Sequence, residues 1–141
     1  MSHEDCIFCK IIDQELPSAK VYEDEHVYAF LDLSQVTKGH TLVIPKTHTK
    51  DIYNTSDDVA AELFARVPKI ARAIKETYKP DGINLLNNNE KAAGQAVFHY
   101  HIHILPRYGT ADGFQPSWVT HEDDYTQQDL QQIAAEINKH I

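Results

Sequence analysis

The chain has 141 residues and a mass of 16.1 kDa, and its 13 lysines and arginines stand against 21 aspartates and glutamates, for a formal net charge of −8. This length indicates one domain, which can bury a core without disulfide bonds. An acidic chain with basic residues scattered along its sequence is a poor ligand for nucleic acid, and no apolar stretch approaches the about 20 residues that cross a membrane. The acidic start MSHEDCIFCK has no apolar signal core, and the two cysteines lie too close together for a useful disulfide loop, so we expect a cytoplasmic protein.

The first part of the chain predicts a short helix and three strands. Residues 6–12 are apolar enough for one or two helical turns. Residues 21–22 and 27–32 are joined by a tight polar turn, which predicts a hairpin. Residues 41–44 form a continuous apolar run closed by Pro45, which predicts a buried strand.

A long amphipathic helix is predicted after the capping residues 56–58. Its apolar side chains recur every three or four residues and therefore share one face: Val59, Leu63, Val67, Ile70 and Ile74. Pro68 removes one backbone hydrogen bond and predicts a kink. The helix is expected to end at residues 79–82, which include a proline and a glycine.

The second part predicts two further strands and a terminal helix. Residues 83–86 form a short strand, residues 87–95 form a polar loop, and the alternation over residues 97–105 predicts the clearest strand of the chain. Thr126 and Asp129 fit a capping box that opens the last helix. The inner face of that helix is expected to carry Leu130, Ile133 and Ile137. The predicted fold class is α+β, an antiparallel sheet with one long helix and a C-terminal helix.

Histidine is the unusual residue, with nine in the chain and three that alternate at His99, His101 and His103. On a strand these three side chains share one face, about 7 Å apart per step, while the apolar spacers anchor the opposite face. Imidazole titrates near neutral pH and serves as a nucleophile, an acid, a base or a metal ligand. The pattern by itself leaves open a tris-imidazole metal site and phosphoryl chemistry.

The loop before the histidines favours phosphate chemistry. Gly94-Gln95-Ala96 is small and flexible enough to turn backbone N–H groups toward an anion. The chain has no G-x-x-x-x-G-K-[ST] sequence and no G-x-G-x-x-G fingerprint after a strand, which excludes a P-loop and a Rossmann site.

The run from His99 to Leu105 resembles the signature of the histidine triad (HIT) family, in which three histidines alternate with apolar residues. Gly94-Gln95-Ala96-Val97 and residues 39–46, GHTLVIPK, resemble two further blocks of that family. The resemblance covers about residues 6–108 in the right order and is strongest toward small bacterial Hit-like members. It implies a HIT-like fold, with an antiparallel meander sheet, in a single domain over residues 1–141, whose C-terminal tail and helix occupy residues 109–141.

The resemblance implies a nucleotide hydrolase that cleaves at the α-phosphorus through a nucleotidyl-histidine intermediate. His101 is then the nucleophile, and the covalent step divides one difficult displacement into two easier ones. Its other ring nitrogen is expected to donate to a backbone carbonyl and fix the tautomer. His103 is expected to contact the α-phosphate, and His40 to lie nearby and tune the site.

The same resemblance places substrate contacts in two further segments. Asn88 matches an amide that touches the phosphate, and Gln95 is expected to shape the loop. Many relatives carry Ser or Thr where this chain has Ala96, so a hydroxyl contact is missing while the backbone N–H groups of Ala96 and Val97 remain available. Asp32 matches the acceptor of the two ribose hydroxyls. An apolar slot for the base is expected from Ile7, Phe8, Ile11, Phe30 and Leu33.

Cys6 and Cys9 form a C-x-x-C pair, which on the sequence alone is a redox pair, half of a metal site or a free pair. A structural zinc needs two more ligands, for which His48 and His99 are the candidates. The resemblance supports zinc, since some bacterial members and the related transferases hold it with two Cys and two His. We therefore expect a closed, structural Zn²⁺ site that ties the N-terminal segment to the histidine motif.

Two substrate classes remain open at this stage, a nucleoside phosphoramidate and a dinucleoside polyphosphate, and a purine nucleotide is the expected partner. The related transferases carry Gln where this chain has His103, so His103 favours hydrolysis. An alternative of a different class is a nucleotide-binding adaptor with incidental turnover. The resemblance also implies a homodimer, and no partnership with nucleic acid or membrane is expected.

Overall fold

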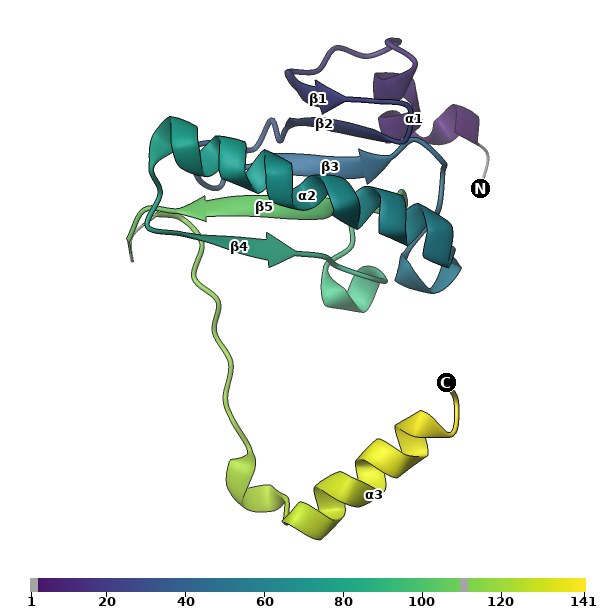
Figure 1. The fold of residues 1–141 in the computed structure, drawn as a ribbon, viewed down its shortest axis with the longest axis vertical. Coiled ribbons are helices and arrows are strands. Elements are labelled where there is room, and N and C mark those ends of the chain that lie inside the picture. The colour runs from purple at the N-terminus through teal and green to yellow at the C-terminus, as the bar shows by residue number, and fades with distance from the viewer. Residues whose placement is uncertain (1–2, 110–111) are drawn as a thin grey trace.

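A five-stranded antiparallel sheet carries the architecture of the computed structural model, which describes residues 3–109 and 112–141 (Figure 1). The strands are β1 (Lys20–Glu23), β2 (Val27–Leu31), β3 (Thr41–Pro45), β4 (Gly82–Leu86) and β5 (Ile102–Arg107). The helices are α1 (Ile7–Ile12), α2 (Asp57–Tyr78) and α3 (Gln127–Asn138). Among the described residues, one short 3₁₀ turn precedes α1 and three lie between later elements. The predicted α+β class is confirmed.

The strand order is β1-β2-β3-β5-β4, and every neighbouring pair is antiparallel. The first three strands follow each other as a meander. The chain then crosses through α2 to the far edge, where β4 forms, and β5 returns into the gap between β3 and β4. This placement puts the histidine segment beside β3 in the centre of the sheet.

The two faces of the sheet are covered by different helices, because strand side chains alternate between faces. One face packs under α2, and its buried cluster includes Val27, Ala29, Val43, Ile102 and Ile104. The opposite face packs near α1, and its buried cluster includes Phe8, Tyr28, Phe30, Leu42 and Ile44. The candidate site lies on this second face.

The long helix α2 follows its sequence signals closely. The Ser56 hydroxyl accepts from the backbone N–H of Val59 at the start, and Lys79 ends the helix in the left-handed conformation. The predicted apolar face is confirmed, because Leu63, Val67, Ile70 and Ile74 are buried. The helix continues through Pro68 as one element.

The C-terminal helix differs from the expectation of a buried inner face. The capping box of Thr126 and Asp129 is confirmed, but α3 stands away from the sheet at the end of an extended segment (Figure 1). The apolar residues expected to face inward are exposed by 48% (Leu130), 40% (Ile133) and 60% (Ile137). Helical periodicity identifies an apolar face but carries no information about which surface covers it.

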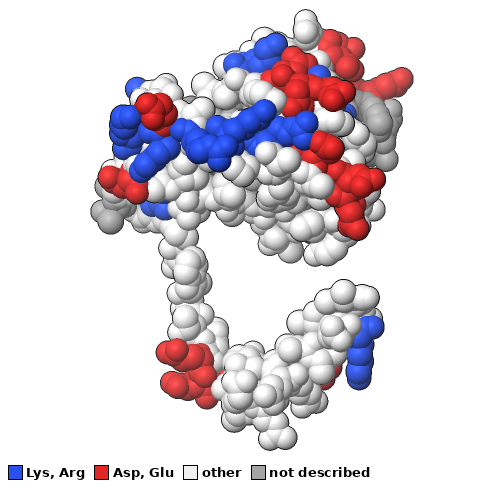
Figure 2. All heavy atoms as spheres, in the orientation of Figure 1, with Lys and Arg blue, Asp and Glu red and all other residues white. Residues whose placement is uncertain are grey.

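The basic residues are less scattered in space than in sequence. Figure 2 shows Lys and Arg side chains gathered in a band over α2, which carries Arg66, Lys69, Arg72 and Lys75. Acidic partners neutralise part of this band, since Arg66 pairs with Asp24 at 2.8 Å. Among the described residues, no helix is long and apolar enough to cross a membrane.

Candidate functional site

The histidine segment enters the sheet later than the sequence predicts. Strand β5 begins at Ile102, so His99 and His101 precede it and only His103 lies on it. The expectation that residues 97–105 form one strand is therefore wrong, and the strand ends at Arg107. The alternation itself holds: Tyr100, Ile102 and Ile104 enter the core under α2, whereas the histidines do not.

His101 has one ring nitrogen fixed and the other without a hydrogen bond to the described residues. Its Nδ1 lies 2.7 Å from the carbonyl oxygen of His99, as expected from the sequence. A carbonyl only accepts, so Nδ1 carries the hydrogen and Nε2 of the neutral ring keeps its lone pair. The His101 residue is 6% exposed, and its ring packs edge-on against Phe8, with ring centroids 5.2 Å apart. The contact with the His99 carbonyl fixes one tautomer of His101, in which Nε2 has the lone pair that a nucleophile requires.

His40 and His103 form a directly bonded imidazole pair. His40 Nε2 and His103 Nδ1 are 2.9 Å apart, and the backbone N–H of Val36 donates to His40 Nδ1 at 3.4 Å. His40 Nε2 therefore carries the hydrogen and donates to His103. Nε2 of neutral His103 then holds the remaining hydrogen, which makes this ring a donor suited to a phosphate oxygen.

The surroundings keep the rings of His40, His101 and His103 neutral. Burial lowers the pKa of all three rings. For His103 the pKa falls to about 4, because the rings of His101 and His40 add like-charge repulsion. Asp32 acts in the opposite direction on each of them, and its carboxylate lies 3.7 Å from His40 Nε2. Neutral rings are the form that attacks phosphorus or donates without a fixed positive charge.

An apolar cavity of about 230 Å³ opens beside these histidines. The structure brings every predicted base-slot residue to its wall, together with Asp32 and Val97, and adds four that the sequence did not indicate: Pro17, Ser18, Leu31 and Leu42. Phe8 links the cavity to the histidines. It lines the cavity, packs edge-on against Phe30 at 5.5 Å and contacts the ring of His101. Strand alternation would have identified Leu42, which is two residues from His40 on the same face.

The loop residues predicted to contact phosphate occupy different environments. The Asn88 carboxamide makes no hydrogen bond to the described residues and remains available, and it lies next to Gly94. Gln95 is buried and shapes the loop: its amide donates to the carbonyl oxygens of Lys50 and Val97. Ala96 is exposed.

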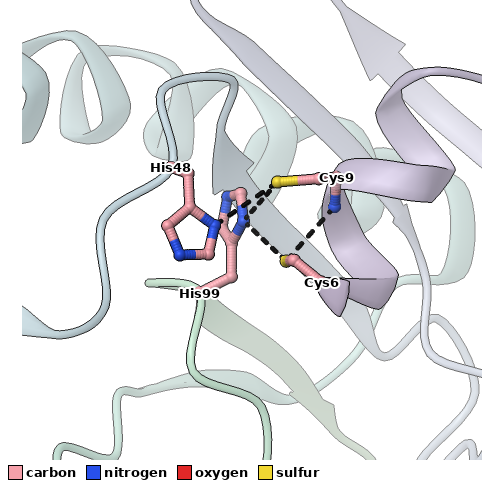
Figure 3. Close-up of side chains that lie close together, drawn as sticks. All are labelled: Cys6, Cys9, His48 and His99. Atoms are coloured by element: carbon pink, nitrogen blue, oxygen red, sulfur yellow. Dashed lines mark hydrogen bonds between the residues drawn. The ribbon is translucent and has the colours of Figure 1, made fainter. Parts of the chain in front are cut away.

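A second cluster lies at the other end of the motif, where Cys6, Cys9, His48 and His99 converge (Figure 3). The cysteines come from the start of α1, His48 from the segment after β3, and His99 from the approach to β5. Sulfur-to-nitrogen distances are 3.3 Å for Cys6–His99, 3.3 Å for Cys9–His48 and 3.6 Å for Cys9–His99. Bonds of about 2.3 Å to sulfur and 2.0 Å to nitrogen at a tetrahedral angle place such atoms about 3.5 Å apart. The donor set fits tetrahedral zinc.

The surroundings of this cluster favour a metal as well. Nε2 of His99 lies 2.8 Å from the carbonyl oxygen of Pro45, so Nε2 carries the hydrogen and Nδ1 presents its lone pair to the two sulfurs. Burial and the neighbouring Cys6 thiol raise the pKa of Cys9 to about 12. A bound cation reverses this effect, because it stabilises the thiolate directly.

A third group of possible ligands, Asp32, His40 and His103, coincides with the imidazole pair. The hydrogen bond between its two rings accounts for their proximity without a metal.

Two polar residues that support the site carry no signal in the sequence. Asn87 donates to the carbonyl oxygen of His101 at 2.9 Å, and the carbonyl oxygen of Thr49 accepts from the backbone N–H of Tyr100 at 2.7 Å. Asn87 belongs to a polar run that resembles any loop, and its role depends on a contact across 14 residues.

Comparison with known proteins gives matches over nearly the whole chain. The family model described as HIT domain matches residues 13–110. The protein hit of Bacillus subtilis is 62% identical over 138 residues, which are 98% of this chain and 95% of that protein. The crystal structure of a HIT family protein from Bacillus anthracis covers 98% of each chain at 56% identity, with a TM-score of 0.95. These matches confirm the resemblance and the expected fold.

Other relatives have names that state an activity or a ligand. An adenosine 5′-monophosphoramidase of Candida albicans is 37% identical over 128 residues, 88% of this chain and 84% of that protein. An adenylylsulfatase of Arabidopsis thaliana is 47% identical over 103 residues, 73% of this chain and 52% of that protein. The crystal structure of a Zn-bound histidine triad family protein from Mycobacterium smegmatis covers 99% of this chain and 100% of its own, at 35% identity and a TM-score of 0.75.

Proposed function

Because the chain belongs to the HIT domain family, we propose that it is a hydrolase that cleaves nucleoside 5′-phosphate derivatives at the α-phosphorus. The observation that carries this proposal is the state of His101. Its Nδ1 faces the carbonyl oxygen of His99 at 2.7 Å, which leaves the Nε2 lone pair unprotonated, and its ring packs against Phe8, which lines a cavity suited to a base.

The proposed reaction has two displacements at phosphorus. In the first, His101 Nε2 forms a bond to the α-phosphorus as the bond to the leaving group breaks, and the leaving group takes a proton from solvent. In the second, water attacks the same phosphorus and loses a proton to solvent as the bond to Nε2 breaks, which releases the nucleoside monophosphate and returns His101 to its neutral form. The Nε2–H of His103 and the Asn88 carboxamide stabilise charge on the phosphoryl oxygens.

The substrate class that we favour is a nucleoside 5′-phosphoramidate with a purine base. The cavity of about 230 Å³ holds one base and is small beside the about 300–1,000 Å³ of larger ligand sites. A second nucleoside would have to lie outside it. Asp32 is placed to accept from the ribose hydroxyls. The names of the Candida and Arabidopsis relatives agree with cleavage of a single adenylyl group from a small leaving group.

We also propose that Cys6, Cys9, His48 and His99 hold a structural Zn²⁺. When bound, it supplies no chemistry to the reaction and ties the start of α1 to the segment that carries His101. The distances of 3.3–3.6 Å and the His99 tautomer support this assignment. A cytoplasmic location belongs to the same proposal, since both thiols must stay reduced to bind the metal.

The exposed apolar face of α3 supports the proposal that the protein is a homodimer. Within the described chain, Leu130, Ile133 and Ile137 remain exposed by 40–60%. The Bacillus anthracis structure superimposes over 98% of this chain with a TM-score of 0.95, so the extended tail is shared with a crystallised relative. A second copy is the occupant we propose for this face. Sedimentation analysis of an Ile133→Glu, Ile137→Glu variant should show a shift from dimer toward monomer, and a wild-type monomer would contradict the proposal.

The experiment that tests the proposed activity compares three substrates with the wild-type protein and His101→Ala. Adenosine 5′-phosphoramidate, adenylyl sulfate and diadenosine triphosphate are each incubated with the protein, and release of AMP is measured. We expect the highest kcat/KM for the phosphoramidate and loss of turnover in the variant. Turnover that survives in His101→Ala would overturn the assignment, and wild-type binding of AMP without turnover of any substrate would favour the adaptor alternative.

A further inference from the structure

His101 lies just before β5, outside the residues that pair in the sheet. The ladder between β4 and β5 pairs Leu86 with His103 and stops there, because the chain leaves β4 at Leu86 and β5 begins at Ile102. The residue after Leu86 is Asn87, and its side chain makes the next hydrogen bond beyond the end of the main-chain ladder. Asn87 Nδ2 donates to the carbonyl oxygen of His101 at 2.9 Å.

The orientation of the Asn87 carboxamide is fixed by a second amide. Asn89 Nδ2 donates to Asn87 Oδ1 at 2.6 Å, and Asn89 Oδ1 accepts from the backbone N–H of Ile52 at 2.8 Å. A flipped Asn87 would place its oxygen against the carbonyl oxygen of His101, and two acceptors do not bond. The relay therefore runs in one direction, from a main-chain N–H near residue 52 to the backbone of His101.

The segment that begins this relay also supports the other side of the histidine motif. Thr49 accepts from the backbone N–H of Tyr100 at 2.7 Å, and Lys50 accepts from the Gln95 side chain at 2.7 Å. His48, in the same segment, faces Cys9 at 3.3 Å. The backbone that carries His101 is thus held from one anchored segment, and the Asn87–Asn89 relay is the part that reaches His101 itself.

We propose that Asn87 is a positioning residue for the nucleophile, with Asn89 holding it in the donating orientation. This proposal depends on the proposed hydrolase function of His101. The ring of His101 is oriented by the His99 carbonyl, and its own carbonyl is oriented by Asn87. Without Asn87, the carbonyl of His101 loses this hydrogen bond, and the backbone that carries the ring is held less firmly on the side before Ile102, where β5 begins. A misplacement of about 1 Å in the reacting atoms costs about 100-fold in rate.

The test uses Asn87→Leu, which keeps the size of the side chain and removes its hydrogen bonds. Asn84→Leu is the matched control, because Asn84 lies on β4, three residues before Asn87, and its side chain accepts from Arg107 at 2.8 Å, away from the histidines. With adenosine 5′-phosphoramidate, kcat of Asn87→Leu should fall about 10- to 100-fold while KM stays within about two-fold. Asn84→Leu should keep the wild-type kcat, and Asn87→Gln, which retains an amide donor, should recover part of the loss.

Several outcomes would overturn the proposal. An unchanged kcat in Asn87→Leu contradicts it directly, and so does an equal loss of kcat and thermal midpoint in Asn87→Leu and Asn84→Leu. If Asn87→Leu does not fold, Asn89→Leu carries the test, with an expected fall in kcat of about three- to ten-fold at unchanged KM. A wild-type protein without His101-dependent turnover removes the premise and the proposal with it, whereas a failure confined to Asn87 leaves the proposed function standing.

Discussion

Two histidines separated by one residue have opposite chemical settings in this molecule. His99 directs Nδ1 at two sulfurs and donates Nε2–H to the Pro45 carbonyl. His101 donates Nδ1–H to the His99 carbonyl, keeps the lone pair on Nε2, and packs against Phe8, a wall residue of the cavity. Both rings are buried. The difference lies in which nitrogen is occupied by a backbone carbonyl, since that choice decides which lone pair is available and what it faces.

One short motif can serve both a metal site and a reaction when its neighbouring rings use different nitrogens. The carbonyl of His99 orients the ring of His101, so the residue that we assign to zinc also sets the tautomer of the nucleophile. Loss of the His99 ring would leave this carbonyl in place but remove the contacts with Pro45 and Cys6 that anchor the backbone around it. A side-chain change at His99 should thus act on both clusters, whereas a change at His101 should act on one.

The largest effect is expected for His101→Ala. Removal of the nucleophile should reduce AMP release from adenosine 5′-phosphoramidate by at least about 1,000-fold, because no other group offers a free imidazole lone pair beside the cavity within the described residues. Zinc content, measured by elemental analysis, should remain at the wild-type level. Loss of zinc together with activity would contradict the expectation that a change at His101 leaves the zinc cluster intact.

His99→Ala should act on both clusters. The variant loses one of four zinc ligands and should bind the metal far more weakly, with a lower thermal midpoint. Turnover should fall about 10- to 100-fold, the usual cost of a lost supporting residue around a metal or reacting group. Elemental analysis and kinetics on one preparation give both quantities. Full zinc retention in His99→Ala would contradict the ligand assignment, and Cys6→Ser serves as the independent check on it.

Asp32→Asn tests the ribose contact at the cavity wall. A carboxylate that accepts from both ribose hydroxyls contributes about 1.5–3 kcal/mol per charged hydrogen bond, so the wild-type protein should prefer a ribonucleotide over its 2′-deoxy analogue by about ten-fold or more. The variant should lose most of this preference. The ratio of kcat/KM for the two substrates is the readout, and an unchanged ratio would place the sugar elsewhere.

The smallest effect concerns stability against pH. The folded-state pKa of His103 is about 4, below its ordinary value of 6.5, so the unfolded chain binds more protons between these two values. The free energy of unfolding should therefore be fully retained above pH 6.5 and should decrease as pH falls from 6.5 toward 4. Urea unfolding at pH 7 and pH 5 measures the difference. His103→Gln should reduce that difference, and an unchanged difference would contradict the lowered pKa.

Local signals in the sequence were sufficient for the helices and for most of the sheet. The face of α2 and its Ser56 cap depend on residues three or four apart, and the capping box of α3 depends on Thr126 and Asp129 alone. The strands β2 and β3 follow from their apolar runs. These features need no knowledge of distant parts of the chain, which is why periodicity and capping predict them.

The features that the sequence did not predict depend on distant contacts. Strand β5 begins late because the N–H of Tyr100 bonds to Thr49 and the carbonyl of His101 bonds to Asn87, so neither joins the ladder. His99 and His101 belong to different clusters for the same reason. Period-two spacing would place both on one face of a strand, but β5 begins only at Ile102, after both residues. The apolar face of α3 is exposed in the described chain, because helical periodicity does not identify the surface that a face packs against.

The central claim is that His101, and not its neighbours in the motif, carries the reaction. The most direct measurement is a rapid neutral quench of the protein turning over adenosine 5′-phosphoramidate, followed by digestion and tandem mass spectrometry of the peptide that spans residues 92–107. We expect one adenylyl group bonded to His101, absent in His101→Ala. An adenylyl group on His99 or His103, or turnover with no adduct on this peptide under conditions that preserve phosphohistidine, would contradict it.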